Sequence, residues 1–318
     1  MEIGISGVGF AVPQKVLTNQ DLEKMVDTSE EWIITRTGIR ERHIVQPGET
    51  ITGFAITAAQ MACETANVSS QKLDFVISST LTPDRISPAQ SFEIAKALNC
   101  NQAFCFDLNA ACSGLMYGIA AAESFLKTRP IKNGLVIAGE HVSRLVDYTD
   151  RNSCVLFGDA AAAIALTNDH PEHLILYTEL GSDPTLGDEV VIGGVQDLLD
   201  GRKNEFYFNQ NGKTVFRFAV NIIKQLFDSV PRKAGLKPEQ IKYVITHQAN
   251  NRIIEAAAKE LASEKTEFII NLDRFGNTSS ASIGVALAES WKRFQKGDYI
   301  LMVGFGGGLS WGATLLEW

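Results

Sequence analysis

The chain has 318 residues, of which 45% are hydrophobic and 21% charged, a balance that excludes a disordered or fibrous protein and suits two domains or one large one. Its 29 Lys and Arg against 37 Asp and Glu give a net charge of −8, which disfavours a general nucleic-acid-binding protein. The five cysteines form no CxxC pair, no leader-like segment opens the sequence and no apolar run is long enough to cross a membrane, so we expect a cytoplasmic protein without disulfides or structural zinc.

Three short apolar segments of the first half recur, in the same order, in the second half. The matched pairs are residues 73–79 with 241–247, 104–109 with 268–273, and 135–139 with 300–304. Each segment is rich in β-branched or aromatic side chains and is bounded by turn residues, so each is a predicted buried strand. We therefore predict a duplicated chain, with an N-terminal half at residues 1–167 and a C-terminal half at residues 168–318.

Helical patterns separate these strands, which indicates parallel βαβ units. The predicted helices cover residues 52–67, 87–98, 113–127, 216–234, 251–261 and 279–295. Residues 27–30 form a capping-box-like start for a further short helix that carries Trp32. Residues 181–212 are the least regular stretch, and we predict a loop over a site there.

Three polar or reactive residues follow predicted strands, at the sheet edge where ligands bind in parallel sheets. Cys112 begins a predicted helix, whose free N–H groups and dipole would lower the pKa of the thiol and make it nucleophilic. His247 follows a strand of the second half, and Asn277 stands where the first repeat carries Cys112. A pseudo-two-fold axis would bring the three together. Each also has a plainer interpretation, as a small packing residue, a strand-end residue or a turn residue.

The remaining reactive side chains give weaker signals. Four cysteines, at positions 63, 100, 105 and 154, are predicted packing residues, and no spacing of His, Cys and carboxylates suggests a metal site. The glycine run Gly304–Gly308 allows close backbone approach, which suits an oxyanion hole or a tight turn. Gly7 and Gly9 lack the third glycine of a dinucleotide fingerprint, so we reject a nucleotide site there.

Six segments, taken together, resemble β-ketoacyl-acyl-carrier-protein synthase III, a family of condensing enzymes. They are residues 31–43, 109–114, 150–159, 247–250, 276–279 and 304–312, and the similarity runs from Ile3 to Leu316. The resemblance implies an α/β thiolase fold, with two pseudo-symmetric βαβ halves in a layered α-β-α-β-α architecture. It also implies a cytoplasmic homodimeric acyltransferase that condenses an acyl-CoA primer with malonyl-acyl carrier protein, initiates fatty acid synthesis and binds no cofactor or metal.

The resemblance assigns roles to residues. Cys112 would accept the acyl group, His247 and Asn277 would stabilise the enolate left by loss of CO2, and the backbone N–H groups of Cys112 and Gly307 would form the oxyanion hole. The implied CoA-binding residues are Thr28, Trp32, Arg36, Arg151, Gly212, Phe216, Ala249 and Asn250. The implied carrier-protein docking residues are Gln248, Arg252 and Arg217. Since the chain is acidic overall, docking of an acidic partner requires a local basic surface around Arg36, Arg151 and Arg252.

Two departures from the family concern the primer pocket. Ser87 stands where the family has a phenylalanine that reaches into the partner's acyl pocket, with Ile86 as a partial replacement. Residues 160–163 are alanines where the family alternates glycine. We therefore expect an acyl primer other than, or larger than, acetyl.

Other functions remain open at this stage. One is a specialised condensing enzyme of secondary metabolism that uses non-acetyl acyl thioesters. Another is a non-catalytic thiolase-fold protein that binds CoA or a carrier protein. A degradative thiolase is disfavoured, because residues 304–308 lack the second cysteine of that chemistry.

Overall fold

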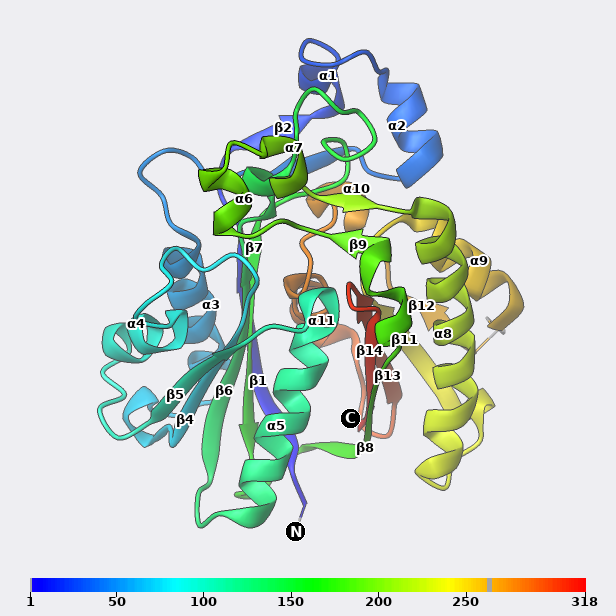
Figure 1. Ribbon diagram of the computed structural model, residues 1–318. Helices are drawn as coiled ribbons and strands as arrows, with labels where there is room; N and C mark the ends of the chain where they lie inside the picture. Colours follow the sequence, from blue (N-terminus) through cyan, green and yellow to red (C-terminus); the bar gives the residue numbers. More distant parts are fainter. Residues whose placement is uncertain (1, 262–264) are drawn as a thin grey trace.

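The computed structural model describes residues 2–261 and 265–318, and a ten-stranded sheet dominates it (Figure 1). The strands of its first half are β1 (Gly4–Ala11), β4 (Phe75–Ser79), β5 (Phe104–Leu108), β6 (Asn133–Glu140) and β7 (Ala160–Thr167). Those of its second half are β8 (His173–Ser182), β11 (Ile241–Thr246), β12 (Glu267–Phe268), β13 (Tyr299–Gly306) and β14 (Ser310–Glu317). The two halves join where β1 pairs with β8.

The strand order repeats on either side of this junction. Outward from the centre the order is β1-β7-β6-β4-β5 in one direction and β8-β14-β13-β11-β12 in the other. The strand next to the outer edge of each half, β4 or β11, pairs in parallel with both of its neighbours. The predicted recurrence of three strands is thus confirmed, although β12 pairs over two residues only. The domain boundary at residues 167 and 168 stays a prediction.

Helices cover both outer faces and fill the space between the halves, which gives the five layers expected (Figure 1). On the first half lie α3 (Ile51–Thr65) and α4 (Gln90–Ala97), on the second α8 (Gly212–Lys233) and α9 (Asn251–Leu261), and between the halves α5 (Gly114–Thr128) and α11 (Ala281–Ser290). Small residues allow this central packing, because a Cβ on Gly284 would lie 2.6 Å from the Ala162 methyl group.

Shorter elements complete the fold and correct some predicted boundaries. They are β2 (Val16–Thr18), α1 (Asn19–Leu22), α2 (Glu30–Thr37), β3 (Glu41–His43), β9 (Val190–Val191), α6 (Val195–Leu199), α7 (Lys203–Phe206), β10 (Asn209–Gln210) and α10 (Leu272–Phe275). Six 3-10 turns are η1 (Ser70–Lys72), η2 (Ala111–Ser113), η3 (Val142–Leu145), η4 (Pro184–Glu189), η5 (Pro238–Gln240) and η6 (Trp291–Arg293). Residues 181–212 therefore contain short elements and are not one loop. The helix α4 begins at Gln90, later than predicted, because the Asp107 carboxylate accepts the N–H groups of Gln90 and Ser91 there.

The predicted capped helix and the packing cysteines are present. Ser29 caps α2 by accepting the N–H group of Trp32. Cys63, Cys100 and Cys154 are buried and Cys105 is half-buried, all as free thiols. No helix among the described residues is both long and apolar enough to cross a lipid bilayer.

Candidate active site

Cys112 lies in η2, between the end of β5 and the start of α5, as the sequence predicts. The residue before it, Ala111, has φ +46°, a strained left-handed conformation. A Cβ on Gly306 would lie 2.7 Å from Cys112 Cβ and 2.9 Å from its backbone nitrogen. Only glycine fits at position 306, so the glycine run passes directly against the thiol-bearing residue.

Two serines hold the glycine run in place. Ser113 Oγ lies 2.8 Å from Ser310 Oγ, and Ser310 Oγ donates to the carbonyl oxygen of Gly307 at 2.9 Å. The Gly307 Cα position lies beside Ala111, whose Cβ is 3.5 Å from the site of an added Cβ. The backbone segments that carry the Cys112 and Gly307 N–H groups are thereby adjacent.

Asn277 is held by its backbone and oriented by its neighbour. Its N–H group donates to Leu156 at 2.8 Å and its carbonyl oxygen accepts from Gly158 at 3.1 Å. The Ser279 N–H group donates to Asn277 Oδ1 at 2.9 Å, with Ser279 at φ +51°. Because the amide oxygen is occupied, the amide NH2 group is left as the donor end of this side chain.

His247 is buried and kept neutral. Its Nδ1 lies 2.8 Å from Ser282 Oγ, which also accepts the Gln248 N–H group at 3.3 Å. We assign the Ser282 hydroxyl as the donor to Nδ1, which places the ring hydrogen on Nε2. Burial lowers the pKa of His247 to about 3. The imidazole therefore offers an Nε2–H donor without a charge.

One segment, residues 277–282, connects all three candidate residues. Asn277 is its first residue, Ser279 Oγ lies 3.5 Å from Cys112 Sγ, and Ser282 holds the His247 ring. The backbone N–H group of His247 also donates to the carbonyl oxygen of Val303, on the strand that leads into the glycine run. This segment therefore contacts both Cys112 and His247 and itself carries Asn277.

The prediction of a lowered thiol pKa is wrong in sign. Burial raises the pKa of Cys112 to about 12, the hydrogen bond with Ser279 opposes this, and the Glu140 carboxylate raises it further. The thiol is only partly exposed at the edge of the central layer, so the cost of desolvating a thiolate outweighs the favourable helix end.

Sequence reasoning missed Glu140, the last residue of β6. It is fully buried in the centre of the site and accepts hydrogen bonds from Ser280 and Thr82, both at 2.7 Å. An acidic residue at the end of an otherwise apolar strand was the available signal.

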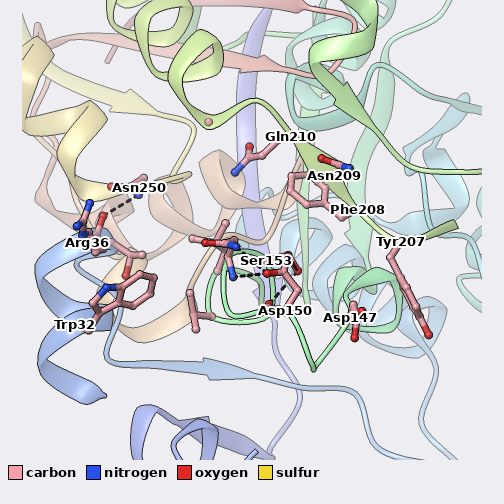
Figure 2. Close-up of a pocket in the computed structure, with 15 residues that line it drawn as sticks. Trp32, Arg36, Asp147, Asp150, Ser153, Tyr207, Phe208, Asn209, Gln210 and Asn250 are labelled. Atoms are coloured by element: carbon pink, nitrogen blue, oxygen red, sulfur yellow. Dashed lines mark hydrogen bonds between the residues drawn. The ribbon is translucent and has the colours of Figure 1, made fainter. Parts of the chain in front are cut away.

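A polar cavity of about 580 Å³ is shown in Figure 2, and its lining includes Leu156, whose carbonyl oxygen accepts the Asn277 N–H group. Four of the predicted CoA-binding residues line it: Trp32, Arg36, Gly212 and Asn250. The guanidinium carbons of Arg36 and Arg151 lie 5.9 Å and 5.2 Å from the centre of the Trp32 ring. Two guanidinium groups therefore lie within cation–π distance of the Trp32 ring.

The other four predicted CoA-binding residues lie outside this lining, among them Arg151 beside Trp32. Thr28 is half-buried, with its hydroxyl oxygen buried and without a hydrogen bond. Phe216 and Ala249 are half-buried and pack against the core of the second half.

The predicted docking residues divide into two groups. Arg217 on α8 and Arg252 on α9 are exposed. Gln248 is only 1% exposed, and its amide bonds to the carbonyl oxygens of Thr246 and Ile269 and to the N–H group of Asn271. The prediction that Gln248 docks a partner is wrong, because its side chain is used up in holding the loop after β11.

A second cavity, of about 600 Å³, opens next to Cys112. Its apolar lining includes Leu81, Val190 and Ile192, together with Tyr117 and Gly307. Ile86 and Ser87 are not among its lining residues, and Ile86 is 87% exposed. Among the described residues, no group of three or more His, Cys, Asp or Glu side chains is placed to hold a metal ion.

Comparisons with known proteins agree with this geometry. Two family models match, described as 3-oxoacyl-[acyl-carrier-protein] synthase III over residues 106–184 and as its C-terminal part over residues 232–318. A β-ketoacyl-[acyl-carrier-protein] synthase III of Desulfitobacterium hafniense is 42% identical, covering 100% of this chain and 98% of the relative. The one of Aquifex aeolicus is 43% identical, covering 99% of each.

Solved structures are similar over the whole chain. The crystal structure of the Aquifex aeolicus 3-oxoacyl-[acyl-carrier-protein] synthase III matches with a TM-score of 0.92 and 42% identity, covering 99% of this chain and 100% of the other. The priming β-ketosynthase of a polyketide pathway matches with a TM-score of 0.93 and 33% identity, covering 99% and 96%.

Proposed function

The chain belongs to the β-ketoacyl-acyl-carrier-protein synthase III family of the thiolase fold, and we propose that Cys112, His247 and Asn277 carry out its reaction. It is an acyltransferase that performs the initiating condensation of fatty acid synthesis. The segment 277–282 supports the residue assignment. It contacts the Cys112 thiol and the His247 ring, and it contains the oriented amide of Asn277.

In the first step, Cys112 takes the acyl group from acyl-CoA. The sulfur attacks the thioester carbonyl, and the N–H groups of Cys112 and Gly307 stabilise the negative oxygen that forms. The Ser113–Ser310 contact supports this role, because it fixes the glycine run beside the thiol before substrate arrives.

In the second step, malonyl-acyl carrier protein loses CO2. The electrons of the breaking C–C bond move onto the thioester oxygen, where the Nε2–H of His247 and the amide NH2 of Asn277 donate to it. The resulting enolate carbon attacks the acyl group on Cys112 and releases the β-ketoacyl product. A neutral imidazole suits this role, because it donates a hydrogen bond and keeps its proton.

The polar cavity of Figure 2 is the CoA site in this proposal. Trp32 and Arg151 hold the adenine ring of CoA between an indole and a guanidinium face, with Arg36 beside them. Arg217 and Arg252, exposed on the adjacent helices α8 and α9, supply the local basic surface that the acidic carrier protein requires.

The active unit is a homodimer in this proposal. The strand β5 is the last in the sheet, and among the described residues no strand pairs with its outer edge. Ile86 and Phe92 expose apolar surface near this edge. Pairing of two such edges would bring the partner's Ile86 and Ser87 toward the primer cavity. The cavity of about 600 Å³ and the small Ser87 support a primer larger than acetyl.

Mass spectrometry of the intact protein tests both the nucleophile and the primer. The protein is mixed with acetyl-, branched and longer acyl-CoAs, and each acyl adduct is measured. We expect adducts with the larger primers that vanish in Cys112→Ala and persist in the matched control Cys105→Ala, a half-buried thiol away from the site. If wild type forms no adduct with any acyl-CoA, the nucleophile assignment is refuted. A preference for acetyl-CoA would refute only the primer assignment.

A further inference from the structure

A line of hydrogen-bonding groups runs from the Cys112 sulfur to a buried carboxylate. Cys112 Sγ lies 3.5 Å from Ser279 Oγ, and Ser279 Oγ donates to Glu140 Oε1 at 3.3 Å. A serine hydroxyl has one hydrogen. Because that hydrogen goes to the carboxylate, the Cys112 S–H group must be the donor in the first contact. Both hydrogens therefore point toward Glu140.

The surroundings of Glu140 suit a group that gains and loses a proton. Besides Ser279, it accepts from Ser280 and Thr82 at 2.7 Å and from the Leu81 N–H group at 3.2 Å. These donors favour the ionised carboxylate. Burial raises its pKa, and no Lys, Arg or His within residues 2–261 and 265–318 forms an ion pair with it. Burial is the largest of these influences and the hydrogen bonds oppose it, so the net shift of the Glu140 pKa is upward, which makes the carboxylate a better proton acceptor.

Cys112 is the titratable group that faces Glu140 from the elements packed around it. The neighbouring segments 80–82 and 279–280 contribute hydroxyl and N–H groups. His141, next in the chain, has its Nε2 3.9 Å from the Asp159 carboxylate. A thiolate and a carboxylate this close resist being charged together. The hydrogen-bond directions from Cys112 through Ser279 to Glu140 are those of a pair that holds one proton, on the thiol.

We propose that Glu140, acting through the Ser279 hydroxyl, is the proton acceptor for the Cys112 thiol. The inference rests on the proposed role of Cys112 as acyl acceptor, and it adds the group that ionises this thiol. An unassisted thiol of pKa about 12 would be a thiolate in about one molecule in 10⁵ at neutral pH. Transfer of the proton to Glu140 removes the like charge at the same moment.

The proton and electron balance closes over the cycle. The Cys112 proton moves to Ser279 Oγ while the Ser279 proton moves to Glu140 Oε1, and the sulfur lone pair forms the new C–S bond. The C–S bond to CoA breaks, and CoA leaves as a thiolate that takes a proton from water. In the condensation, the acyl C–S bond breaks and the Cys112 thiolate recovers its proton from Glu140 through Ser279.

The pH profile of Cys112 alkylation tests this proposal. The rate of reaction with iodoacetamide is measured by mass spectrometry from about pH 6 to pH 9, with the site assigned by peptide mapping. While the pair holds one proton, transfer inside it does not depend on pH, so wild type should show a plateau. In Glu140→Gln the plateau should give way to a rise of about tenfold per pH unit, with a rate at neutral pH at least about tenfold lower.

Two serine variants form a matched pair. Ser279→Ala cuts the line and leaves the carboxylate, so it should lose the plateau as Glu140→Gln does. Ser280→Ala removes the shorter hydrogen bond to the same oxygen and leaves the line intact, so it should keep the plateau. Circular dichroism checks the fold of each variant. If Glu140→Gln does not fold, the comparison of Ser279→Ala with Ser280→Ala still tests the proposal.

Two results would overturn the proposal. One is a plateau that survives in both Glu140→Gln and Ser279→Ala. The other is faster alkylation of Glu140→Gln than of wild type at neutral pH, because Glu140 would then only repel the thiolate. If wild type forms the acyl adduct on Cys112 but shows no plateau, only the assignment of Glu140 as proton acceptor is refuted. If wild type forms no adduct, the assignment of Cys112 as nucleophile is refuted.

Discussion

The hydroxyl of Ser282 is expected to decide how fast malonyl-acyl carrier protein loses CO2. It lies 2.8 Å from His247 Nδ1 and 3.3 Å from the Gln248 backbone nitrogen, and Ser282 and His247 are each 2% exposed. Ser282→Ala leaves a buried ring nitrogen and a buried N–H group without this partner, at a cost of about 1–3 kcal/mol. The ring is then free to carry its hydrogen on Nδ1, where it cannot donate to the enolate oxygen. If that cost falls on the transition state, decarboxylation slows by about 5- to 150-fold.

Two assays on one preparation separate this role from general damage. Decarboxylation is measured as CO2 release from malonyl-acyl carrier protein, and acylation of Cys112 by acyl-CoA is followed by mass spectrometry. We expect decarboxylation to fall while acylation changes by less than about threefold, since the proposed acylation donors are backbone N–H groups. Ser290→Ala, at the far end of the same helix, is the matched control. Unchanged decarboxylation, or an equal fall in both reactions, would refute the tautomer argument.

Three further predictions test the packing, the CoA site and the buried imidazole. Gly306→Ala should slow acylation of Cys112 at least about 100-fold, because its Cβ would meet the Cys112 backbone at 2.9 Å, whereas Gly187→Ala meets nothing closer than 3.6 Å and should not. Trp32→Ala should raise the KM for acyl-CoA about 5- to 30-fold, for a lost stacking contact of about 1–2 kcal/mol, with decarboxylation rates unchanged. His247 has a pKa of about 3 in the folded protein and 6.5 in the unfolded chain. Below pH 6.5 only the unfolded chain gains the proton, so the free energy of unfolding decreases as the pH is lowered. From neutral pH to about pH 4.5, urea titrations should show wild type losing about 2.7 kcal/mol more than His247→Asn; equal losses would contradict the lowered pKa.

Local patterns were sufficient to predict most of the framework. Apolar runs such as Phe75–Ser79 are strands because each buries both faces, and their recurrence anticipates the repeated strand order. The positions of Cys112 and His247 at strand ends follow from the same reasoning, since parallel strands bring their carboxyl ends to one edge. These features depend on spacing along the chain, which the sequence records directly.

Burial and side-chain partners were decided by the tertiary structure. The sequence predicts an activated thiol at a helix start, but packing from the second half desolvates Cys112 and reverses the direction of its pKa shift. Gln248 lies within a segment that resembles a docking surface, yet its amide is consumed by neighbouring backbone. Both outcomes depend on groups brought from distant parts of the chain, and a local pattern contains no record of them.

Glu140 shows the same division most clearly. Alone, the sequence determines an acid at the end of a buried strand, whose ordinary interpretation is an exposed strand end. The fold brings Thr82 from one loop and Ser279 and Ser280 from a segment about 140 residues away onto its two oxygens. A carboxylate can stay in the interior only with such donors around it, so its place beside Cys112 became visible only once the two halves were packed together.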